Sequence, residues 1–112
     1  MNLRIVCDER DGSWIARAVR DDNGDPFGVE CRAATRDEAE ARLRRWLDWQ
    51  REHAEALQAL QQAEHAYHRT VAGSAFAPED GSALENQKAA LKTVEAARIR
   101  LDAVRAARPE AT

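Results

Sequence analysis

The run from Val29 to Ala72 contains neither glycine nor proline, and this uninterrupted stretch is the strongest constraint on the fold. Near its start, Thr35 precedes Glu38 by three residues. This is the spacing of a capping box, in which the hydroxyl and the carboxylate accept hydrogen bonds from free N–H groups of the first helical turn. We therefore predict one helix over residues 36–72. It would be about 55 Å long at 1.5 Å per residue, too long to pack along its whole length on a small sheet.

A second helix is predicted after a break in the pattern that contains Pro78. Ser82 and Glu85 have the spacing of another capping box, and Pro109 stops the helical pattern, so we place this helix at residues 83–108. A short connection between two helices favours antiparallel packing. We therefore expect a helical hairpin.

Three segments with apolar residues at every second position precede the long helix, at about residues 2–8, 13–20 and 27–33. Asp11-Gly12 separates the first two segments, and this pair is typical of a two-residue hairpin with positive φ at both positions. Turn-forming residues separate the second and third segments. The pattern predicts a three-stranded antiparallel meander.

The predicted fold class is α+β. The meander packs on the start of the long helix (about 36–72), and the helix at about 83–108 is its antiparallel hairpin partner. We expect residues 1–112 to form a single domain, which is an ordinary length for one. Within it, residues 1–50 form the sheet and the start of the helix, and residues 50–108 form a projecting helical hairpin.

The two cysteines, Cys7 and Cys31, fall in the first and third strands of the meander. These strands flank the second one, so the two residues would lie about 10 Å apart, two strand spacings. A disulfide needs a shorter separation. We therefore expect two free thiols.

Composition and charge narrow the class of protein. The net charge is −3, which disfavours a general nucleic-acid-binding protein, since such proteins carry a basic excess. The sequence contains neither an apolar run of membrane-spanning length nor a signal-peptide pattern, so we expect a cytoplasmic protein that does not bind membranes. Of the 17 basic residues, 15 are arginine, which is typical of a GC-rich bacterial genome.

A shortage of large apolar side chains points to self-association. Of the 49 hydrophobic residues, 23 are alanine. The apolar residues of the last predicted helix cover an arc of about 160°, which is wider than one neighbouring helix needs. We therefore expect a homodimer in which two hairpins form a four-helix bundle. The predicted interface residues are Leu57, Leu60, Tyr67, Val71, Leu91, Val94, Leu101 and Val104. A monomer with water-exposed alanine-rich faces is the alternative.

Candidate metal ligands are few. His65 and His68 lie three residues apart on the long helix, a spacing that can bring two imidazoles to one metal ion, but the sequence fixes no third ligand. We therefore expect surface histidines without a metal ion. Asp21-x-Asn23-x-Asp25 imitates the start of a calcium loop, yet proline and arginine replace the glycine and glutamate that this loop requires, so a turn is predicted.

Arginines around two tryptophans form the remaining cluster. Such a pattern can stack on nucleic-acid bases. Acidic residues in the same helical turns cancel most of the charge, so we expect the tryptophans to belong to the core and nucleic-acid binding to be absent. The cluster comprises Arg42, Arg44, Arg45 and Arg51 around Trp46 and Trp49. The sequence contains no catalytic or phosphate-binding motif, so we expect no enzymatic activity and no cofactor.

Residues 3–50 carry a family resemblance. The segments that carry it are Asp11-Gly12-Ser13-Trp14-Ile15-Ala16, Pro26-Phe27-Gly28 and Ala34-Thr35-Arg36-Asp37-Glu38-Ala39. This pattern resembles HicB-like domains, which have a degenerate RNase H-like layout. The chain departs from the family at Ala33 or Ala34, one of which stands where glycine is usual. The family's fourth strand and its appended DNA-binding segment also have no counterpart here.

Two functions follow as hypotheses. The favoured one is a non-enzymatic bacterial protein-interaction or regulatory module whose partner the sequence does not name. The alternative, implied by the resemblance, is an antitoxin that binds a partner toxin and can also contact nucleic acid.

Overall fold

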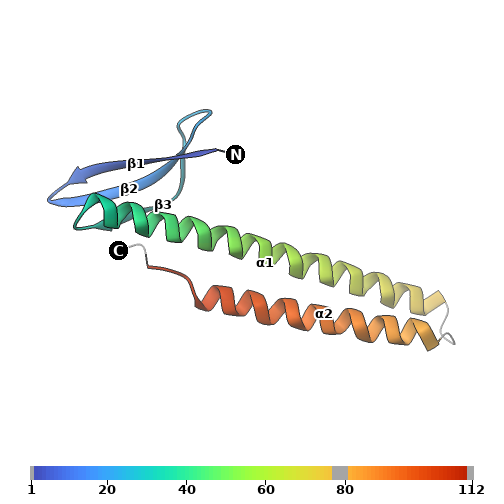
Figure 1. The fold of residues 1–112 in the computed structure, drawn as a ribbon. Coiled ribbons are helices and arrows are strands. Elements are labelled where there is room, and N and C mark those ends of the chain that lie inside the picture. Colours follow the sequence, from blue (N-terminus) through green and yellow to red (C-terminus); the bar gives the residue numbers. More distant parts are fainter. Residues whose placement is uncertain (1, 77–80, 111–112) are drawn as a thin grey trace. The chain divides into compact units, whose positions relative to one another are not determined.

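The computed structural model of the chain describes residues 2–76 and 81–110 (Figure 1). Three strands come first and two helices follow, which confirms the α+β class. The elements are β1 (Leu3–Arg10), β2 (Ser13–Arg20), β3 (Pro26–Ala33), α1 (Arg36–Phe76) and α2 (Gly81–Ala106).

The chain divides into two compact units. The first comprises Met1–Arg51 and Arg108–Thr112, and the second comprises Glu52–Ala107. The division within α1 lies next to residue 50, where the sequence places the change from the sheet-covering part of the helix to the hairpin. Each unit has buried residues of its own.

The sheet of the first unit is an antiparallel meander in the order β1-β2-β3. Asp11 and Gly12 have φ values of 51° and 77°, as the predicted two-residue turn requires. β1 and β2 pair without irregularity from Leu3↔Arg20 to Arg10↔Ser13. β1 therefore ends at Arg10 and not at residue 8, because so tight a turn lets pairing continue up to the residues that flank it.

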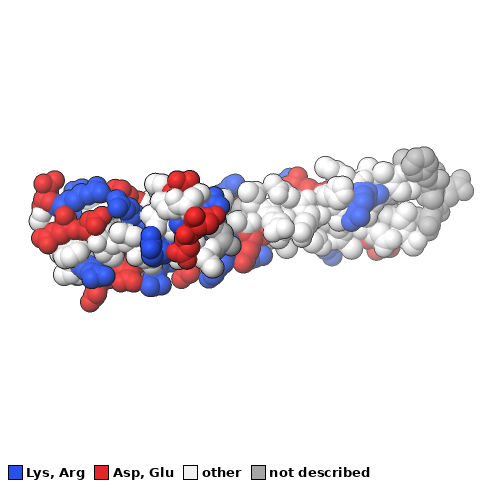
Figure 2. All heavy atoms as spheres, turned by 90° about the horizontal axis from the view of Figure 1, so that it is seen from above, with Lys and Arg blue, Asp and Glu red and all other residues white. Residues whose placement is uncertain are grey.

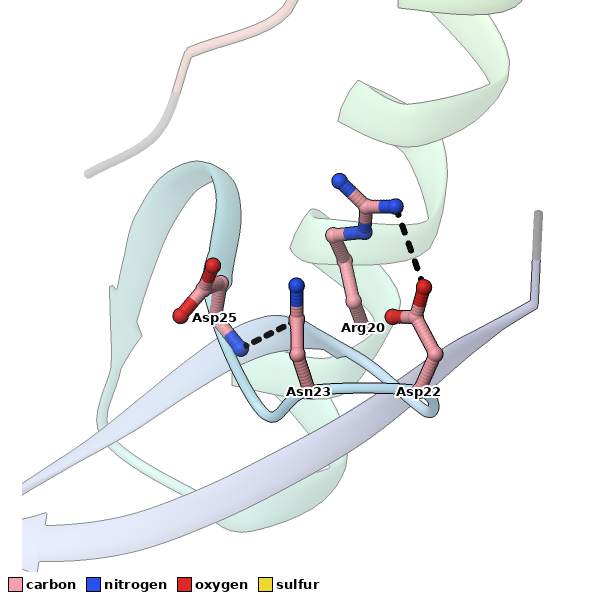
Figure 3. A network of polar contacts seen from close by, with 4 residues as sticks. All are labelled: Arg20, Asp22, Asn23 and Asp25. Atoms are coloured by element: carbon pink, nitrogen blue, oxygen red, sulfur yellow. Dashed lines mark hydrogen bonds and ion pairs between the residues drawn. The ribbon is translucent and has the colours of Figure 1, made fainter.

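The turn between β2 and β3 is held by its own side chains (Figure 3). The Asp25 N–H donates to Asn23 Oδ1 at 2.9 Å, and Arg20 Nη2 lies 3.1 Å from Asp22 Oδ2. The Gly24 N–H donates to the Arg20 carbonyl at 2.8 Å. The residues that imitate a calcium loop thus form a hydrogen-bonded turn.

The pairing of β3 with β2 contains a bulge. Ala16 pairs with Cys31 and Ala18 pairs with Phe27, so three β3 residues lie opposite Arg17. Gly28, inside this bulge, has a φ of 81°. Bulges often contain glycine because a left-handed backbone is strained for other residues.

The core of the first unit lies between one face of the sheet and the first turns of α1. Its buried residues are Ala16, Ala18, Cys31, Ala33, Ala39, Leu43 and Trp46. Helix α1 begins where the sequence predicts, and the Glu38 N–H donates to Thr35 Oγ1 at 3.2 Å. Cys7 and Cys31 both pair with Ala16, from opposite sides, and both are free thiols as expected.

The second unit is a pair of antiparallel helices formed by α1 from Glu52 onward and by α2 (Figure 1). Ala56 and Ala63 of α1 are buried, as are Val94 and Leu101 of α2. These four residues form the seam between the helices. Arg105 Nε also lies 3.4 Å from Nε2 of His53 across the pair.

The helix ends differ from the prediction in three places. Helix α1 continues through Gly73 to Phe76, four residues past the predicted end, because an interior glycine costs a helix only about 1 kcal/mol. Helix α2 begins at Gly81 and not at residue 83, so Ser82 lies inside the helix. It ends at Ala106, two residues before the predicted end. Residues 77–80, with Pro78, lie outside the described residues.

Within the described ranges, neither helix has a stretch that is both long and apolar enough to cross a membrane.

Candidate interaction surface

The structure separates the predicted interface residues into two groups. Val94 and Leu101 are only 4% and 3% exposed and belong to the seam of the hairpin, so they cannot meet a second molecule while the hairpin is intact. Val71 and Leu91 are exposed. Leu57, Leu60, Tyr67 and Val104 are half-buried at the edges of the seam. The prediction is thus corrected for the two residues at the centre of the α2 apolar arc.

Leu84 of α2 is an exposed residue that the sequence-based interface did not include, with 53% of its surface accessible. It precedes Leu91 by seven residues, which is two helical turns, so the two leucines lie one above the other. Both lie on one flank of the stripe formed by Val94 and Leu101. The seven-residue spacing of Leu84 and Leu91 is visible in the sequence. Only the position of the seam shows that both leucines are exposed.

Helical geometry brings the exposed residues of both helices to one side of the hairpin. On α2, Leu91 is turned about 60° from Val94 around the helix axis. On α1, Val71 is turned from Ala56 by about the same angle in the same sense. Because the two helices are antiparallel, equal turns in the same sense carry both residues to the same side of the pair. We call this surface the apolar face; it comprises Leu57, Leu60, Tyr67, Val71, Leu84 and Leu91.

Charges are absent from the first part of the apolar face on α1, whereas on α2 Lys88 lies between Leu84 and Leu91 along the helix and Glu95 follows Leu91 by one turn. Residues 56–63 of α1 contain no charged side chain. Figure 2 shows Lys, Arg, Asp and Glu crowded over the first unit, whereas the outer turns of the hairpin are mostly pale in this view. A surface of this kind loses little solvation free energy when another apolar surface covers it.

Ile99 of α2 is the most exposed large apolar residue among those described, at 71%, and it lies further from the seam around the helix than Leu84 and Leu91. It is turned about 140° from Val94 around the helix axis, in the same sense as Leu84 and Leu91, from which it is about 60–80° away. Ile99 therefore provides an internal comparison for the apolar face, because it has a similar size and a different orientation.

The arginine–tryptophan cluster belongs to the first unit. Trp46 is buried in the core, as predicted, and its ring centroid lies 6.4 Å from that of Trp49. The Arg108 guanidinium lies 5.7 Å from the Trp49 ring centroid, as in a cation–π contact. Trp49 thus contacts both Trp46 and Arg108 of the same chain.

Three of the four arginines of this cluster have contacts within the chain, and Arg42 Nη1 donates to the Arg32 carbonyl at 2.8 Å. Arg44 lies 2.8 Å from Glu40, and Arg51 lies 3.3 Å from Asp48. Each of these two exposed arginines thus lies beside a carboxylate of the same helix.

The candidate metal ligands are not joined by further ligands. His65 and His68 are both exposed on α1. In residues 2–76 and 81–110, no three side chains of the types His, Cys, Asp and Glu come together closely enough to hold a metal ion.

The buried thiol of Cys31 has a shifted acidity. Burial raises the pKa of its thiol above the ordinary value, although the positive charges of Arg42 and Arg45 act in the opposite direction. A thiol that stays protonated is a poor nucleophile and a poor metal ligand. Cys31 therefore acts as a small apolar core residue.

A shallow hollow of about 280 Å³ lies at the β3 bulge, between Arg17 and Glu30, with Val19 and Phe27 on its walls. Sites for small molecules usually measure about 300–1,000 Å³ and bury most of the ligand. The hollow is slightly smaller than this range and is open to solvent.

In comparisons with known proteins, the chain matches no family model, no curated protein and no solved structure.

Proposed function

We propose that this chain is a non-enzymatic protein-interaction module that self-associates through the apolar face of its helical hairpin. The observation that supports this function is the exposure of Val71, Leu84 and Leu91, at 40%, 53% and 41%, on one side of the second unit. Large apolar side chains grouped on one surface favour contact with another protein surface. We further propose that the protein acts in the cytoplasm.

A second copy is the occupant that this face fits best. The hairpin seam contains Ala56 and Ala63 on its α1 side, so each hairpin buries little apolar surface by itself. Two apolar faces related by a two-fold axis would cover each other with the same residues and form a four-helix bundle. Because residues 56–63 are uncharged, no like charges meet in this stretch of the contact.

The test is the oligomeric state of variants that place a charge on the apolar face. We expect Leu84→Glu/Leu91→Glu to sediment as a smaller species than wild-type protein at about 50 µM, because two buried carboxylates in each copy oppose association through the apolar face. Ile99→Glu, about 60–80° further from the seam around α2, is the matched control and should sediment as wild-type protein does. Circular dichroism verifies that each variant stays helical. A wild-type monomer at this concentration, or equal dissociation of both variants, would contradict the proposal.

An antitoxin resembling HicB-like proteins is the second candidate. It is supported by the order β-β-β-α in residues 3–51, which is the layout that the resemblance implies. In this function the chain would bind and mask a toxin encoded beside it.

Co-expression tests the second candidate. If the product of a neighbouring small reading frame arrests growth, the chain should relieve the arrest and co-purify with that product. A neighbour that is harmless, or a chain that fails to bind it, would exclude this candidate and leave the self-association proposal unaffected.

A further inference from the structure

β1 is an edge strand with an open side. It has eight residues, and all of them pair with β2 without a bulge. In the described part of the chain no other strand pairs with it. It contains no proline or glycine to interrupt a further ladder. Such an edge presents a row of backbone donors and acceptors to any extended chain.

The opposite edge of the same sheet is blocked. β3 contains the bulge around Gly28, which bends the strand and breaks its regular spacing. In addition, Arg42 Nη1 donates a hydrogen bond of 2.8 Å to the carbonyl oxygen of Arg32. The protein therefore protects one edge of its sheet and leaves the other free for pairing.

The tight turn determines which β1 residues face the open side. In a two-residue hairpin, the residues that flank the turn form a hydrogen-bonded pair, here Arg10 and Ser13. Hydrogen-bonded and non-hydrogen-bonded pairs alternate along an antiparallel ladder. The even-numbered residues of β1 therefore direct their N–H and C=O groups toward β2. The odd-numbered residues, from Leu3 to Glu9, direct theirs toward the open edge.

We propose that β1 pairs in antiparallel fashion with β1 of a second copy, on a two-fold axis at Val6, so that the two sheets join into one of six strands. In this register Ile5 lies opposite Cys7 of the second copy in a hydrogen-bonded pair. Val6 lies opposite Val6, and Arg4 lies opposite Asp8 of the second copy. By symmetry, the Arg4–Asp8 pair occurs twice.

Charge selects this register among its neighbours. A two-fold axis at Cys7 would place Arg4 opposite Arg10, so that like charges meet twice. An axis at Ile5 would place Arg4 opposite Val6 and leave both charges without a partner. Only the axis at Val6 pairs opposite charges and also matches apolar residues on both sheet faces. The same charges make β1 selective, because a strand without this pattern would leave Arg4 and Asp8 unmatched.

Asp8 can take part without losing its existing contact. Its Oδ2 lies 3.3 Å from Arg17 Nη2, and its side chain is 43% exposed. Oδ1 is therefore available to Arg4 of a second copy, so the pairing extends the ion pair into a network across the joined sheets.

Cysteine cross-linking tests the register directly. Two Val6 residues facing each other as a non-hydrogen-bonded pair would have Cα atoms about 4.5 Å apart. This separation suits a disulfide. With copper–phenanthroline as the oxidant, Val6→Cys should form a covalent dimer of twice 12.5 kDa. Arg4→Cys is the control, because its two copies would lie about 13 Å apart, four residues along the ladder. It should show no more dimer than the wild-type chain with Cys7 and Cys31.

Charge exchange gives an independent test in the full chain. Arg4→Glu and Asp8→Lys should each weaken edge pairing, whereas an equimolar mixture should restore it. In a mixed dimer the introduced carboxylate of one copy lies opposite the introduced ammonium group of the other, and the second pair keeps Arg4 opposite Asp8. Arg10→Glu, outside the matched pairs, is the control.

Both charge variants also carry Leu84→Glu/Leu91→Glu, so that this measurement does not depend on the hairpin face. Equal cross-linking of Val6→Cys and Arg4→Cys, or no gain of dimer on mixing the charge variants, would overturn the proposal.

Discussion

A β-carbon added to Gly28 would lie 2.6 Å from Cζ3 of Trp46, so the tryptophan ring of α1 packs directly against the backbone of the β3 bulge. No ordinary β-carbon tolerates such a contact. The bulge and the buried tryptophan therefore depend on each other. Because Gly28 has no side chain, the tryptophan ring has space beside the backbone. The ring in turn covers the bulged segment of β3, which does not pair regularly with β2.

Replacement of Gly28 by alanine should therefore destabilise the first unit more than replacement of Gly24. Both glycines have positive φ, at 81° and 73°, but an added carbon at Gly24 meets no atom within 4 Å. Gly24→Ala should lower the free energy of unfolding by about 1–2 kcal/mol through backbone strain alone. Gly28→Ala should cost about 1–3 kcal/mol more because of overpacking. Urea unfolding measures both.

A double-mutant cycle identifies the cause of this difference. Trp46→Leu removes the ring that the new methyl group would strike. Gly28→Ala should then cost about as much in the Trp46→Leu background as Gly24→Ala costs in wild type. If the costs in the two backgrounds were equal, the contact with Trp46 would not be the reason.

Loss of the helix cap should weaken the first unit. Thr35 Oγ1 accepts the N–H of Glu38 at the start of α1. Thr35→Ala should lower the free energy of unfolding by about 1 kcal/mol, since an N-terminal N–H group loses its partner. Thr35→Ser keeps the hydroxyl and should lie within a few tenths of a kcal/mol of wild type in the same measurement. Equal losses for both variants would contradict the capping role.

Leu101 and Leu91 should respond differently to truncation. Leu101→Ala empties part of the hairpin seam and should lower the free energy of unfolding by about 2–5 kcal/mol at every protein concentration. Leu91→Ala, at an exposed position, should have an effect only where copies associate. Thermal unfolding at about 2 µM and 200 µM separates the two cases. A concentration-independent loss at Leu91 would place this residue in the seam and not on the apolar face.

Cys31 should be protected from modification. In folded protein at pH 8 we expect a thiol reagent to label half-buried Cys7 and to spare Cys31, whereas unfolded protein should show two thiols. Two variants separate the thiols. Cys7→Ser leaves only Cys31 and should be labelled slowly, whereas Cys31→Ser leaves only Cys7 and should be labelled fast. Fast labelling of Cys7→Ser would contradict the burial of Cys31.

The same thiol gives a pH dependence with a definite sign. The pKa of Cys31 is higher in the folded state, so its stabilising contribution is present below the pKa of an unfolded cysteine, about 8.5. The contribution is lost as pH rises from there through the folded pKa, because ionisation of the thiol stabilises the unfolded chain. Between pH 8 and pH 10, wild type should lose more unfolding free energy than Cys31→Ala. Parallel curves would contradict the assignment.

The elements of the fold could be predicted from local patterns, and the errors occur where distant parts of the chain decide. Asp11-Gly12 and Thr35 with Glu38 carry their signals within a few residues, so the first turn and the start of α1 are correct. The β3 bulge was missed because it depends on Trp46, eighteen residues further along the chain. Gly73, just past the predicted helix end, could not be distinguished from an interior glycine by its neighbours.

The candidate interface was harder to predict for a related reason. The apolar residues of α2 cover a broad arc, and the sequence does not say which part of the arc faces α1. The structure assigns Val94 and Leu101 to the seam and leaves Leu84 and Leu91 exposed. The periodicity of the sequence locates the apolar arc. Only the position of the neighbouring helix determines which residues of the arc are buried in the seam and which stay exposed.

The alanine-rich seam of the second unit has a consequence for the motions of the protein. Alanine lets two helices approach closely, but each buried methyl group contributes little hydrophobic stabilisation. Helices held in this way open and close more readily than a sheet covered by leucine and tryptophan. Backbone amide protons at residues 52–76 and 81–107 should therefore exchange with deuterium before those of β2. Any surface that covers the hairpin would slow this exchange, so the hairpin itself can report when the molecule is bound.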